Sequence, residues 1–274
     1  MDVEGFAESM QEAIVVPEQM LDTQAARDEL RRNVEVTLEF LAEHQTCGTF
    51  FVLGRIAEDM PELVRCIADA GHEIGSHSQR HLRLFNLAAE DAREAIARSK
   101  KSLEDAAGVR VRGFRAPDFS ITAQSWYLMD VIRDAGYEYD SSVYPIRGHD
   151  VYGIPDASRW PYRLSNGLAE FPLSTLCVAG RRLPVLGGGY FRLYPLWLTR
   201  WALRSIEKAR QPAMCYIHPY EFGPICPQVS GISPARRFRH YVNRTKTLAR
   251  FAALFGRFRF GRADTVLRAA GLLG

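Results

Sequence analysis

Apolar positions along the first 140 residues fall into two patterns, which predict helices and short strands in turn. Helical spacing occurs in four segments, at residues 25–44, 61–70, 88–107 and 122–135. Short apolar runs, typical of buried parallel strands, separate them at residues 48–53, 73–75, 111–114 and 137–140. This regular succession of strand and helix favours an α/β fold, in which helices cover a parallel sheet.

The second half of the chain is less regular. Residues 144–189 are rich in proline and glycine, and we expect a long inserted loop there, of the kind that often shapes a substrate cleft. A further strand is expected at 215–218, and residues 235–274 look mostly helical apart from a strand-like run at 257–260. No repeat or low-complexity linker divides the sequence, so we expect one domain over residues 1–274.

His77 and His81 follow the predicted strand at 73–75 and stand four residues apart. On a helical turn this spacing brings two side chains to one face, and neutral imidazole is the commonest protein ligand of zinc and similar metals. The spacing alone is a weak signal, because such a pair on a solvated helix usually binds nothing. Asp2 and Glu4 are the candidate carboxylates, since in an extended segment they point to one side, where one would ligate a metal and the other accept a proton. The alternative is an acidic, disordered N-terminus.

Other unusual polar residues also stand at the C-terminal ends of predicted strands, where the chemistry of parallel α/β folds is found. Arg115, Asp140 and His218 each end or directly follow such a strand. This repeated placement indicates one site. Each residue has an alternative role: Arg115 in a structural ion pair, Asp140 as a turn or helix cap, and His218 as a satisfied core histidine.

The formal net charge of +3 is close to neutral for 274 residues, so nothing global indicates nucleic acid as a partner. Basic residues gather at 235–240 and 257–262, either as solvated surface or as a patch for an anionic glycan, a lipid-linked phosphate or a membrane surface. The sequence shows no apolar run near 20 residues, no signal peptide and no Cys-x-x-Cys pair. We therefore expect a cytoplasmic protein without a transmembrane segment.

Five short motifs stand in order along the chain: Asp2-x-Glu4, His77-x-x-x-His81, Arg115-x-Pro117, Asp140-Ser141-Ser142 and His218-Pro219. This set resembles the motifs of the NodB-homology polysaccharide deacetylases. The closest likeness is to the branch associated with exosortase-linked exopolysaccharide gene clusters, through phrases such as His218-Pro219-Tyr220-Glu221. The resemblance implies a distorted (β/α) barrel of about seven parallel strands and one divalent metal, for which we expect zinc.

The resemblance also implies a role for each matching residue in the hydrolysis of an N-acetyl group on a sugar. The metal ligands would be Glu4, His77 and His81. Asp2 would be the catalytic base, oriented by Arg115, and His218 would be the general acid. Asp140 would lie near the acid histidine or on the floor of the pocket.

The expected function is removal of N-acetyl groups from a polysaccharide or a lipid-linked oligosaccharide by metal-activated water. Gly188 and Tyr190 lie in a glycine-rich loop where backbone can approach a sugar, and Trp160 is the candidate for stacking on a sugar ring. One departure from the family pattern concerns Asp2: the strand that precedes the first motif is almost absent, so we expect a truncated first strand that holds its carboxylates poorly. Two alternatives stay open, a hydrolase of small non-peptide C–N bonds (allantoinase-like) and a catalytically impaired glycan-binding protein.

Overall fold

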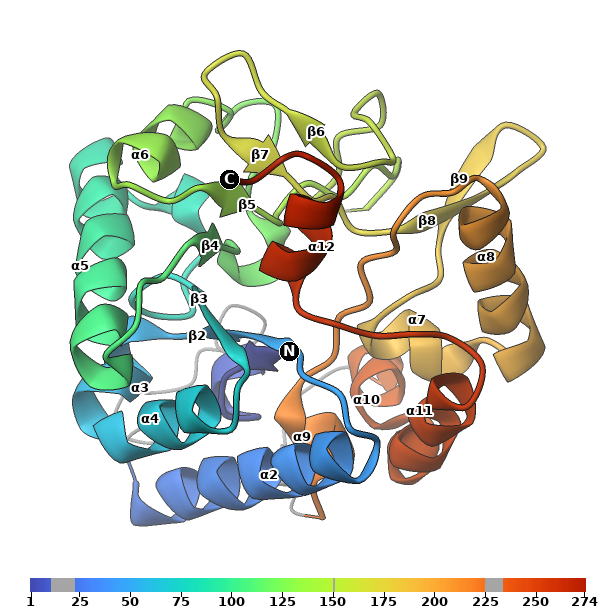
Figure 1. Ribbon diagram of the computed structural model, residues 1–274, viewed down its shortest axis with the longest axis horizontal. Helices are drawn as coiled ribbons and strands as arrows, with labels where there is room; N and C mark the ends of the chain where they lie inside the picture. Colours follow the sequence, from blue (N-terminus) through green and yellow to red (C-terminus); the bar gives the residue numbers. More distant parts are fainter. Residues whose placement is uncertain (11–22, 150, 225–233) are drawn as a thin grey trace.

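A computed structural model describes residues 1–10, 23–149, 151–224 and 234–274. A seven-stranded sheet lies at its centre and helices surround it (Figure 1). The strands of this sheet are β1 (Asp2–Val3), β2 (Thr49–Val52), β3 (Glu73–Ser76), β4 (Gly113–Phe114), β5 (Tyr139–Asp140), β6 (Tyr162–Arg163) and β7 (Ala169–Glu170). The α-helices are α2 (Gln24–Glu43), α3 (Gly54–Asp59), α4 (Pro61–Asp69), α5 (Ala89–Ala107), α6 (Leu128–Asp134), α7 (Gly188–Leu193), α8 (Leu196–Lys208), α9 (Pro219–Phe222), α10 (Pro234–Tyr241), α11 (Thr247–Phe255) and α12 (Ala263–Ala269), and the short 3-10 helices are η1 (Glu8–Met10), η2 (Leu84–Asn86), η3 (Pro117–Phe119) and η4 (Arg244–Lys246).

The sheet confirms the predicted α/β class. Its order is β1-β2-β3-β4-β5-β7-β6, and β1, β2, β3, β4, β5 and β7 pair in parallel with their neighbours. β6 is antiparallel to β7. Within the described ranges the sheet therefore has an antiparallel edge strand where about seven parallel strands were expected.

β1 is two residues long, yet it is held on both sides. It pairs with β2 on one side, and on the other the backbone N–H of Asp2 donates to the carbonyl of Ile217 at 3.0 Å. Tyr216, beside it, forms a single parallel bridge with Gly187. The segment 215–218, predicted as a strand, thus contributes one isolated bridge. These contacts extend the sheet beyond β1 in the direction of a distorted barrel, and they place the carboxylates of the first strand firmly.

The helices begin and end where the sequence carries capping signals. Thr23 caps α2 by accepting the backbone N–H of Ala26 at 3.1 Å. α4 begins at Pro61. Proline lacks a backbone N–H, but at the first position of a helix that N–H would have no partner within the helix in any case. α5 ends at Gly108, which adopts the left-handed conformation (φ +68°) that favours glycine after a helix. Among the described helices, none has the length and apolar character needed to cross a membrane.

In residues 144–189, where the sequence predicts a long inserted loop, the described part of the chain contains short strands joined by irregular segments. These residues contain β6 and β7 of the main sheet and a separate antiparallel hairpin of β8 (Thr175–Val178) and β9 (Arg181–Pro184). β7 has only two residues, which is too short for an alternating pattern to appear. Its conformation is fixed by pairing with β5, and strand formation depends strongly on such neighbours.

The strand-like run at 257–260 forms no strand. Phe258 and Phe260 pack against the hydrophobic core, and Phe260 stacks on Phe255 of α11 with ring centroids 4.4 Å apart. The alternation of arginine and phenylalanine therefore reflects packing of every second side chain on the core, with the arginines toward solvent.

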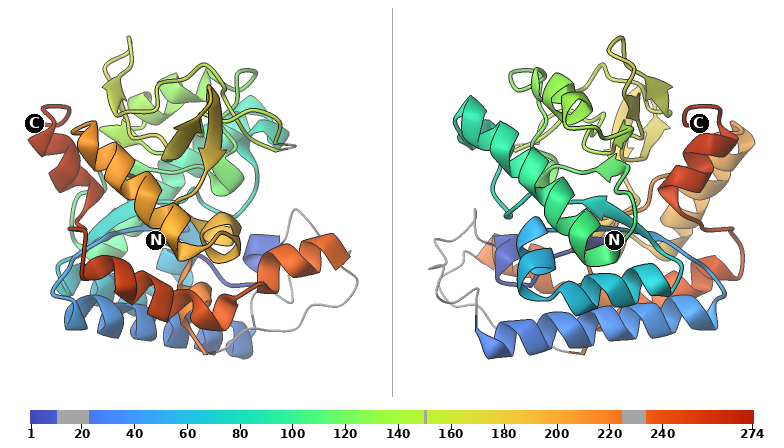
Figure 2. Two further views of the ribbon diagram at one scale, coloured as in Figure 1. Left: turned by 90° about the vertical axis from the view of Figure 1, so that its right-hand side faces the viewer. Right: turned by 60° about the vertical axis from the view of Figure 1, so that its left-hand side comes forward.

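α12 covers the N-terminal ends of the strands. The N–H of Ala263 donates to the Thr49 hydroxyl at 2.7 Å, and the N–H of Asp264 donates to the Glu73 carboxylate at 3.0 Å. Thr49 and Glu73 are the first residues of β2 and β3. Figure 2 shows α12 on one side of the barrel and α10 on the opposite side, where the strands have their C-terminal ends.

The buried carboxyl of Glu29 on α2 gives a prediction for stability against pH. It accepts hydrogen bonds from the N–H of Phe6 at 3.3 Å and the amide of Asn33 at 3.2 Å. Burial, reinforced by Glu8, raises the pKa of Glu29 to about 7. Because the folded-state pKa lies above the unfolded value, Glu29 destabilises the fold as pH rises through this range. We expect Glu29→Gln to be about 1–3 kcal/mol more stable than wild type at pH 8 and equal to it near pH 4.5, in urea unfolding.

The matched control is Glu39→Gln, which changes an exposed carboxyl on the same helix. Its stability difference from wild type should be the same at both pH values. A pH-independent difference for Glu29→Gln would show that Glu29 ionises in the fold as readily as an exposed residue.

Candidate metal centre and active site

A cavity of about 200 Å³ is lined by residues that lie at or beyond the C-terminal ends of the strands. It brings together residues from almost the whole chain, namely Asp2, Glu4, Ser9, His77, His81, Arg83, Asp118, Phe119, His149, Val151, Tyr152, Gly188, Gly189, Arg192, Tyr216, His218, Tyr220, Glu221 and His240. The convergence follows from the parallel sheet, because all its parallel strands end at the same rim.

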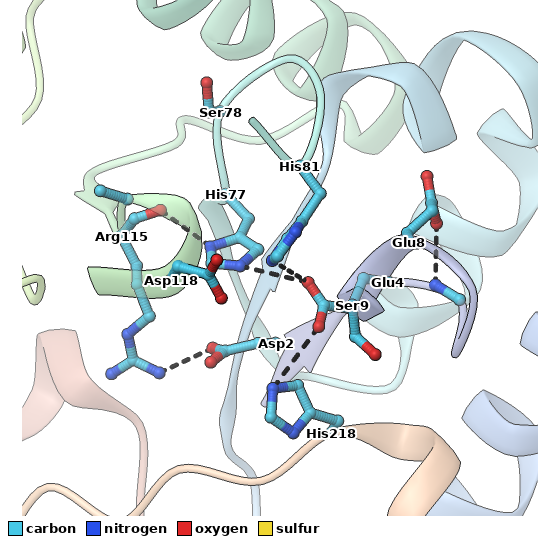
Figure 3. Close-up of polar contacts among 12 residues, drawn as sticks. Asp2, Glu4, Glu8, Ser9, His77, Ser78, His81, Arg115, Asp118 and His218 are labelled. Atoms are coloured by element: carbon cyan, nitrogen blue, oxygen red, sulfur yellow. Dashed lines mark hydrogen bonds and ion pairs between the residues drawn. The ribbon is translucent and has the colours of Figure 1, made fainter. Parts of the chain in front are cut away.

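Glu4, His77 and His81 form a buried cluster with the donor atoms of a metal site. Glu4 Oε2 lies 2.7 Å from Nε2 of His81 and 3.5 Å from Nε2 of His77 (Figure 3). His77 hydrogen-bonds through Nδ1 to the carbonyl of Arg115 at 2.8 Å. This contact places the ring proton on Nδ1 and leaves Nε2 as a lone-pair donor toward the cluster, as metal-binding histidines require.

The chemistry of this cluster fits a divalent cation. Among the described residues, the buried Glu4 Oε2 faces only the two imidazole nitrogens and has no further hydrogen-bond donor, and a cation bound between the three groups would satisfy it. Burial opposes ionisation of Glu4, but His81 and His77 keep the pKa of its carboxyl below the usual range. Burial likewise opposes charge on His81, yet Glu4 raises the pKa of that imidazole to about 9. Two imidazoles and one carboxylate suit zinc and several related metals.

Asp2 is held by a buried arginine beside this cluster. Arg115 Nη1 donates to Asp2 Oδ1 at 2.7 Å, and neither side chain is more than 2% exposed. Burial raises the pKa of Asp2, but Arg115, together with His77, the N-terminal amine and His218, outweighs burial and the net shift is downward. Arg115 itself donates to the carbonyl and the hydroxyl of Ser141 at 3.0 and 2.8 Å. Asp2 is thus an ionised carboxylate in a fixed orientation on the cavity wall.

Asp140 does not reach the cavity, contrary to the expectation that it lies near the acid histidine or the pocket floor. Its carboxylate accepts the N–H and the hydroxyl of Ser142 at 2.8 and 2.7 Å, and the same hydroxyl accepts the N–H of Ala116 at 2.8 Å. Burial raises the pKa of Asp140, and burial together with Asp140 raises that of the neighbouring Glu170 well above its usual value. Asp140 therefore shapes the turn that carries Ser141, the partner of Arg115.

His218 also lines the cavity, and its imidazole faces the carboxylate of Glu4 (Figure 3). It precedes α9, whose first residue Pro219 forces the extended backbone conformation seen at His218. Its Nε2 lies 3.5 Å from Glu4 Oε1, and its ring stacks on Tyr220 at 4.8 Å. Burial lowers the pKa of His218, but the carboxylates of Glu221, Glu4 and Asp2 raise it above the usual value overall.

Of the three residues expected to bind substrate, only Gly188 lines the cavity. Trp160 packs against the core with the Arg159 guanidinium 4.7 Å above its ring, and Tyr190 stacks on Tyr194. Both aromatic side chains are engaged by neighbours within the fold, which sequence context alone does not reveal.

Several cavity residues were missed in the sequence. Glu221 and Arg192 meet in a buried ion pair at 3.0 Å, and Asp118 pairs with Arg83 at 2.8 Å near the cavity mouth. The signal for Glu221 was present, since it follows His218 by three residues, a capping-box spacing. Arg192 gave no such signal, because the contact spans distant elements.

Two family models match consecutive parts of the chain. Residues 22–139 match the polysaccharide deacetylase model, and residues 141–268 match a domain of unknown function, DUF3473. The candidate site uses both segments together with Asp2 and Glu4, which precede the first match.

Similar proteins with assigned functions include a chitooligosaccharide deacetylase of Azorhizobium caulinodans, 36% identical over 99 residues, which are 36% of this chain and 46% of that protein. A peptidoglycan-N-acetylglucosamine deacetylase of Bacillus cereus is 35% identical over 80 residues, 29% of each chain. The chain thus spans less than half the length of these curated relatives.

Solved structures support the barrel fold. A putative polysaccharide deacetylase from Mycobacterium smegmatis is similar over 100% of this chain and 90% of its own, with a TM-score of 0.67 and 21% identity. Puue allantoinase is similar over 97% of this chain and 87% of its own, with a TM-score of 0.60 and 15% identity. The chain thus contains a polysaccharide deacetylase (NodB-homology) domain at residues 22–139, which continues into a DUF3473 segment at residues 141–268.

Proposed function

We propose that this protein is a metal-dependent hydrolase that removes N-acetyl groups from a polysaccharide or a lipid-linked oligosaccharide. The observation that carries the proposal is the convergence of Glu4, His77 and His81 on one buried spot, with Asp2 and His218 lining the same cavity. The polysaccharide deacetylase domain and the names of the relatives support the same substrate class.

Glu4, His77 and His81 would hold the metal, and zinc is the ion that we propose. When bound, such an ion polarises a carbonyl group and makes water a competent nucleophile near neutral pH. Three protein ligands leave a tetrahedral site open for this purpose. The remaining work of the reaction falls to the residues around the ligands.

Asp2 would act as the general base. Water attacks the carbonyl carbon of the N-acetyl group, a C–O bond forms, and the carboxylate of Asp2 takes the proton that the water loses. Arg115 keeps Asp2 ionised and fixes its orientation through the 2.7 Å contact, so the acceptor oxygen needs no reorganisation when the proton arrives.

His218 would act as the general acid. As the C–N bond breaks, its Nε2 donates a proton to the departing nitrogen, and the products are acetate and the free amine of the sugar. Asp2 and His218 line the same cavity, so the base and the acid would reach the same scissile group. Division of proton transfer between two residues of opposite charge is consistent with the directions of their pKa shifts.

The proposal is tested with zinc-supplemented protein and N-acetylated chito-oligosaccharides, by following acetate release and by mass spectrometry of the sugar. Loss of 42 Da per acetyl group is expected, by the mass balance of deacetylation. Turnover of a cyclic ureide such as allantoin, with no change in the sugars, would support the alternative small-molecule hydrolase. Glycan binding without metal and without turnover of either substrate would support the impaired glycan-binding protein and refute hydrolysis.

A further inference from the structure

We propose that Glu221, anchored by Arg192, is the positioning residue that orients the imidazole of His218 with Nδ1–H toward Glu221 and Nε2 toward the cavity. The inference deepens the proposed function and rests on it for the role of His218 as the acid. It assigns to the DUF3473 segment the task of holding the acid in place.

Glu221 contacts His218 with one carboxylate oxygen and Arg192 with the other. Its Oε2 accepts the backbone N–H of His218 at 3.3 Å and lies 3.7 Å from Nδ1 of the same residue. Its Oε1 lies 3.0 Å from Nε of Arg192. The side chains of Glu221 and Arg192 are at most 4% exposed, so this pair is shielded from water.

Such a buried carboxylate is stable only with a partner, because an isolated charge in the interior carries a large desolvation cost. Arg192 provides the opposite charge from α7, the helix whose first glycine lines the cavity. Arg192 is in turn tied to the C-terminal helices, since it donates to the carbonyl of His240 and its own carbonyl accepts the Asn243 amide at 3.1 Å. Glu221 is therefore held in place by its ion pair with Arg192 as well as by the backbone of α9.

The position of the carboxylate selects one tautomer of His218. A carboxylate is only an acceptor, so the ring nitrogen that faces it must carry hydrogen. Glu4 Oε1 lies 3.5 Å from Nε2 on the other side of the ring, but the proposed metal would take up the charge of Glu4. Glu221 would then decide the tautomer and leave the lone pair of neutral His218 on Nε2. The 3.7 Å separation from Glu221 is an ion-pair contact, longer than a hydrogen bond, and contacts of this kind commonly tighten when substrate binds.

Asp140 does not orient the imidazole of His218. The family resemblance places it near the acid histidine, but both its oxygens are engaged by Ser142 outside the cavity. Among the described residues, Glu221 is the carboxylate that faces Nδ1 of His218, at 3.7 Å. Orientation of an acid or base histidine by a carboxylate on its other nitrogen is a general device in enzymes.

The first test is kinetic, on the zinc-supplemented protein. Glu221→Gln should lower kcat by about 10- to 100-fold with KM within twofold of wild type. In a His218→Ala background the same substitution should change kcat by less than twofold, because its effect passes through the imidazole. Glu207→Gln, an exposed carboxyl on α8, is the matched control and should be silent in both backgrounds. Equal losses from Glu221→Gln with and without His218 would overturn the proposal.

The second test needs no turnover. Nitrogen NMR shifts of the His218 ring, assigned by comparison with His218→Ala, should show a protonated Nδ1 and a bare Nε2 when the ring is neutral. Glu221→Gln should shift the population toward the other tautomer, while Glu207→Gln should leave it unchanged. A tautomer that does not respond to Glu221→Gln would overturn the inference. If the tautomer responds but no acetylated glycan is hydrolysed, the positioning role stands and the proposed reaction fails.

Discussion

Replacement of His81 by alanine is expected to reduce bound zinc to less than about 0.1 ion per chain and kcat/KM for deacetylation by at least about a thousandfold. His81 provides the nitrogen nearest to Glu4 in the cluster, at 2.7 Å. Its loss leaves two ligands, one imidazole and one carboxylate, too few to retain zinc against dialysis. Metal content is measured by elemental analysis after dialysis, and activity by acetate release.

The control is His44→Ala, which removes a histidine at the end of α2, outside the cavity. It should retain wild-type zinc and activity. Circular dichroism and thermal unfolding establish that both variants are folded. A His81→Ala protein that keeps one zinc per chain would contradict the proposed ligand set, whatever its activity.

Much of the candidate site could be predicted because strand ends carry a strong sequence signal. His77 and Arg115 directly follow short strands and His81 comes four residues after His77, and parallel strands bring such positions to one rim. The placement of Asp2 and Glu4 was less certain from sequence. The structure resolves it through backbone contacts on both sides of β1, with β2 and with Ile217.

What the sequence could not specify depends on contacts between distant elements. The two residues of β7 contain no period of their own and are set by β5. The sequence does not reveal that the guanidinium of Arg159 lies over the ring of Trp160, the residue predicted to stack on a sugar. Glu221 has a local relation to His218, but its anchoring by Arg192 bridges 29 positions of the chain, from 192 to 221.

The two family segments contribute different parts of the candidate site. The deacetylase segment carries the histidine pair and Arg115, whereas His218, Glu221 and Arg192 lie in the DUF3473 segment. In the proposed reaction the first segment would bind the metal together with Glu4 and would orient Asp2 through Arg115, and the second segment would present the acid. Because neither segment contains both proton-transfer groups, we expect neither to be active alone.

Replacement of Asp2 by asparagine separates metal binding from proton transfer. Asparagine keeps an oxygen that can accept from Arg115 at the place where Oδ1 now lies, but it cannot take a proton from water at neutral pH. We expect kcat to fall by about a thousandfold, within the range for loss of a general base, while zinc content stays at the wild-type level because Asp2 is outside the ligand cluster. Single-turnover acetate release and elemental analysis measure the two effects on one preparation.

The cost in stability must be separated from the cost in catalysis, because the variant leaves the buried Arg115 without its counter-charge, a loss of about 3–5 kcal/mol. Activity is therefore compared at a temperature where urea titration shows both proteins fully folded. Asp130→Asn, at an exposed position on α6, is the matched control and should lose neither zinc nor activity. If folded, zinc-loaded Asp2→Asn retained more than a tenth of wild-type kcat, the base would have to be another group, and the Asp2–Arg115 pair would be structural.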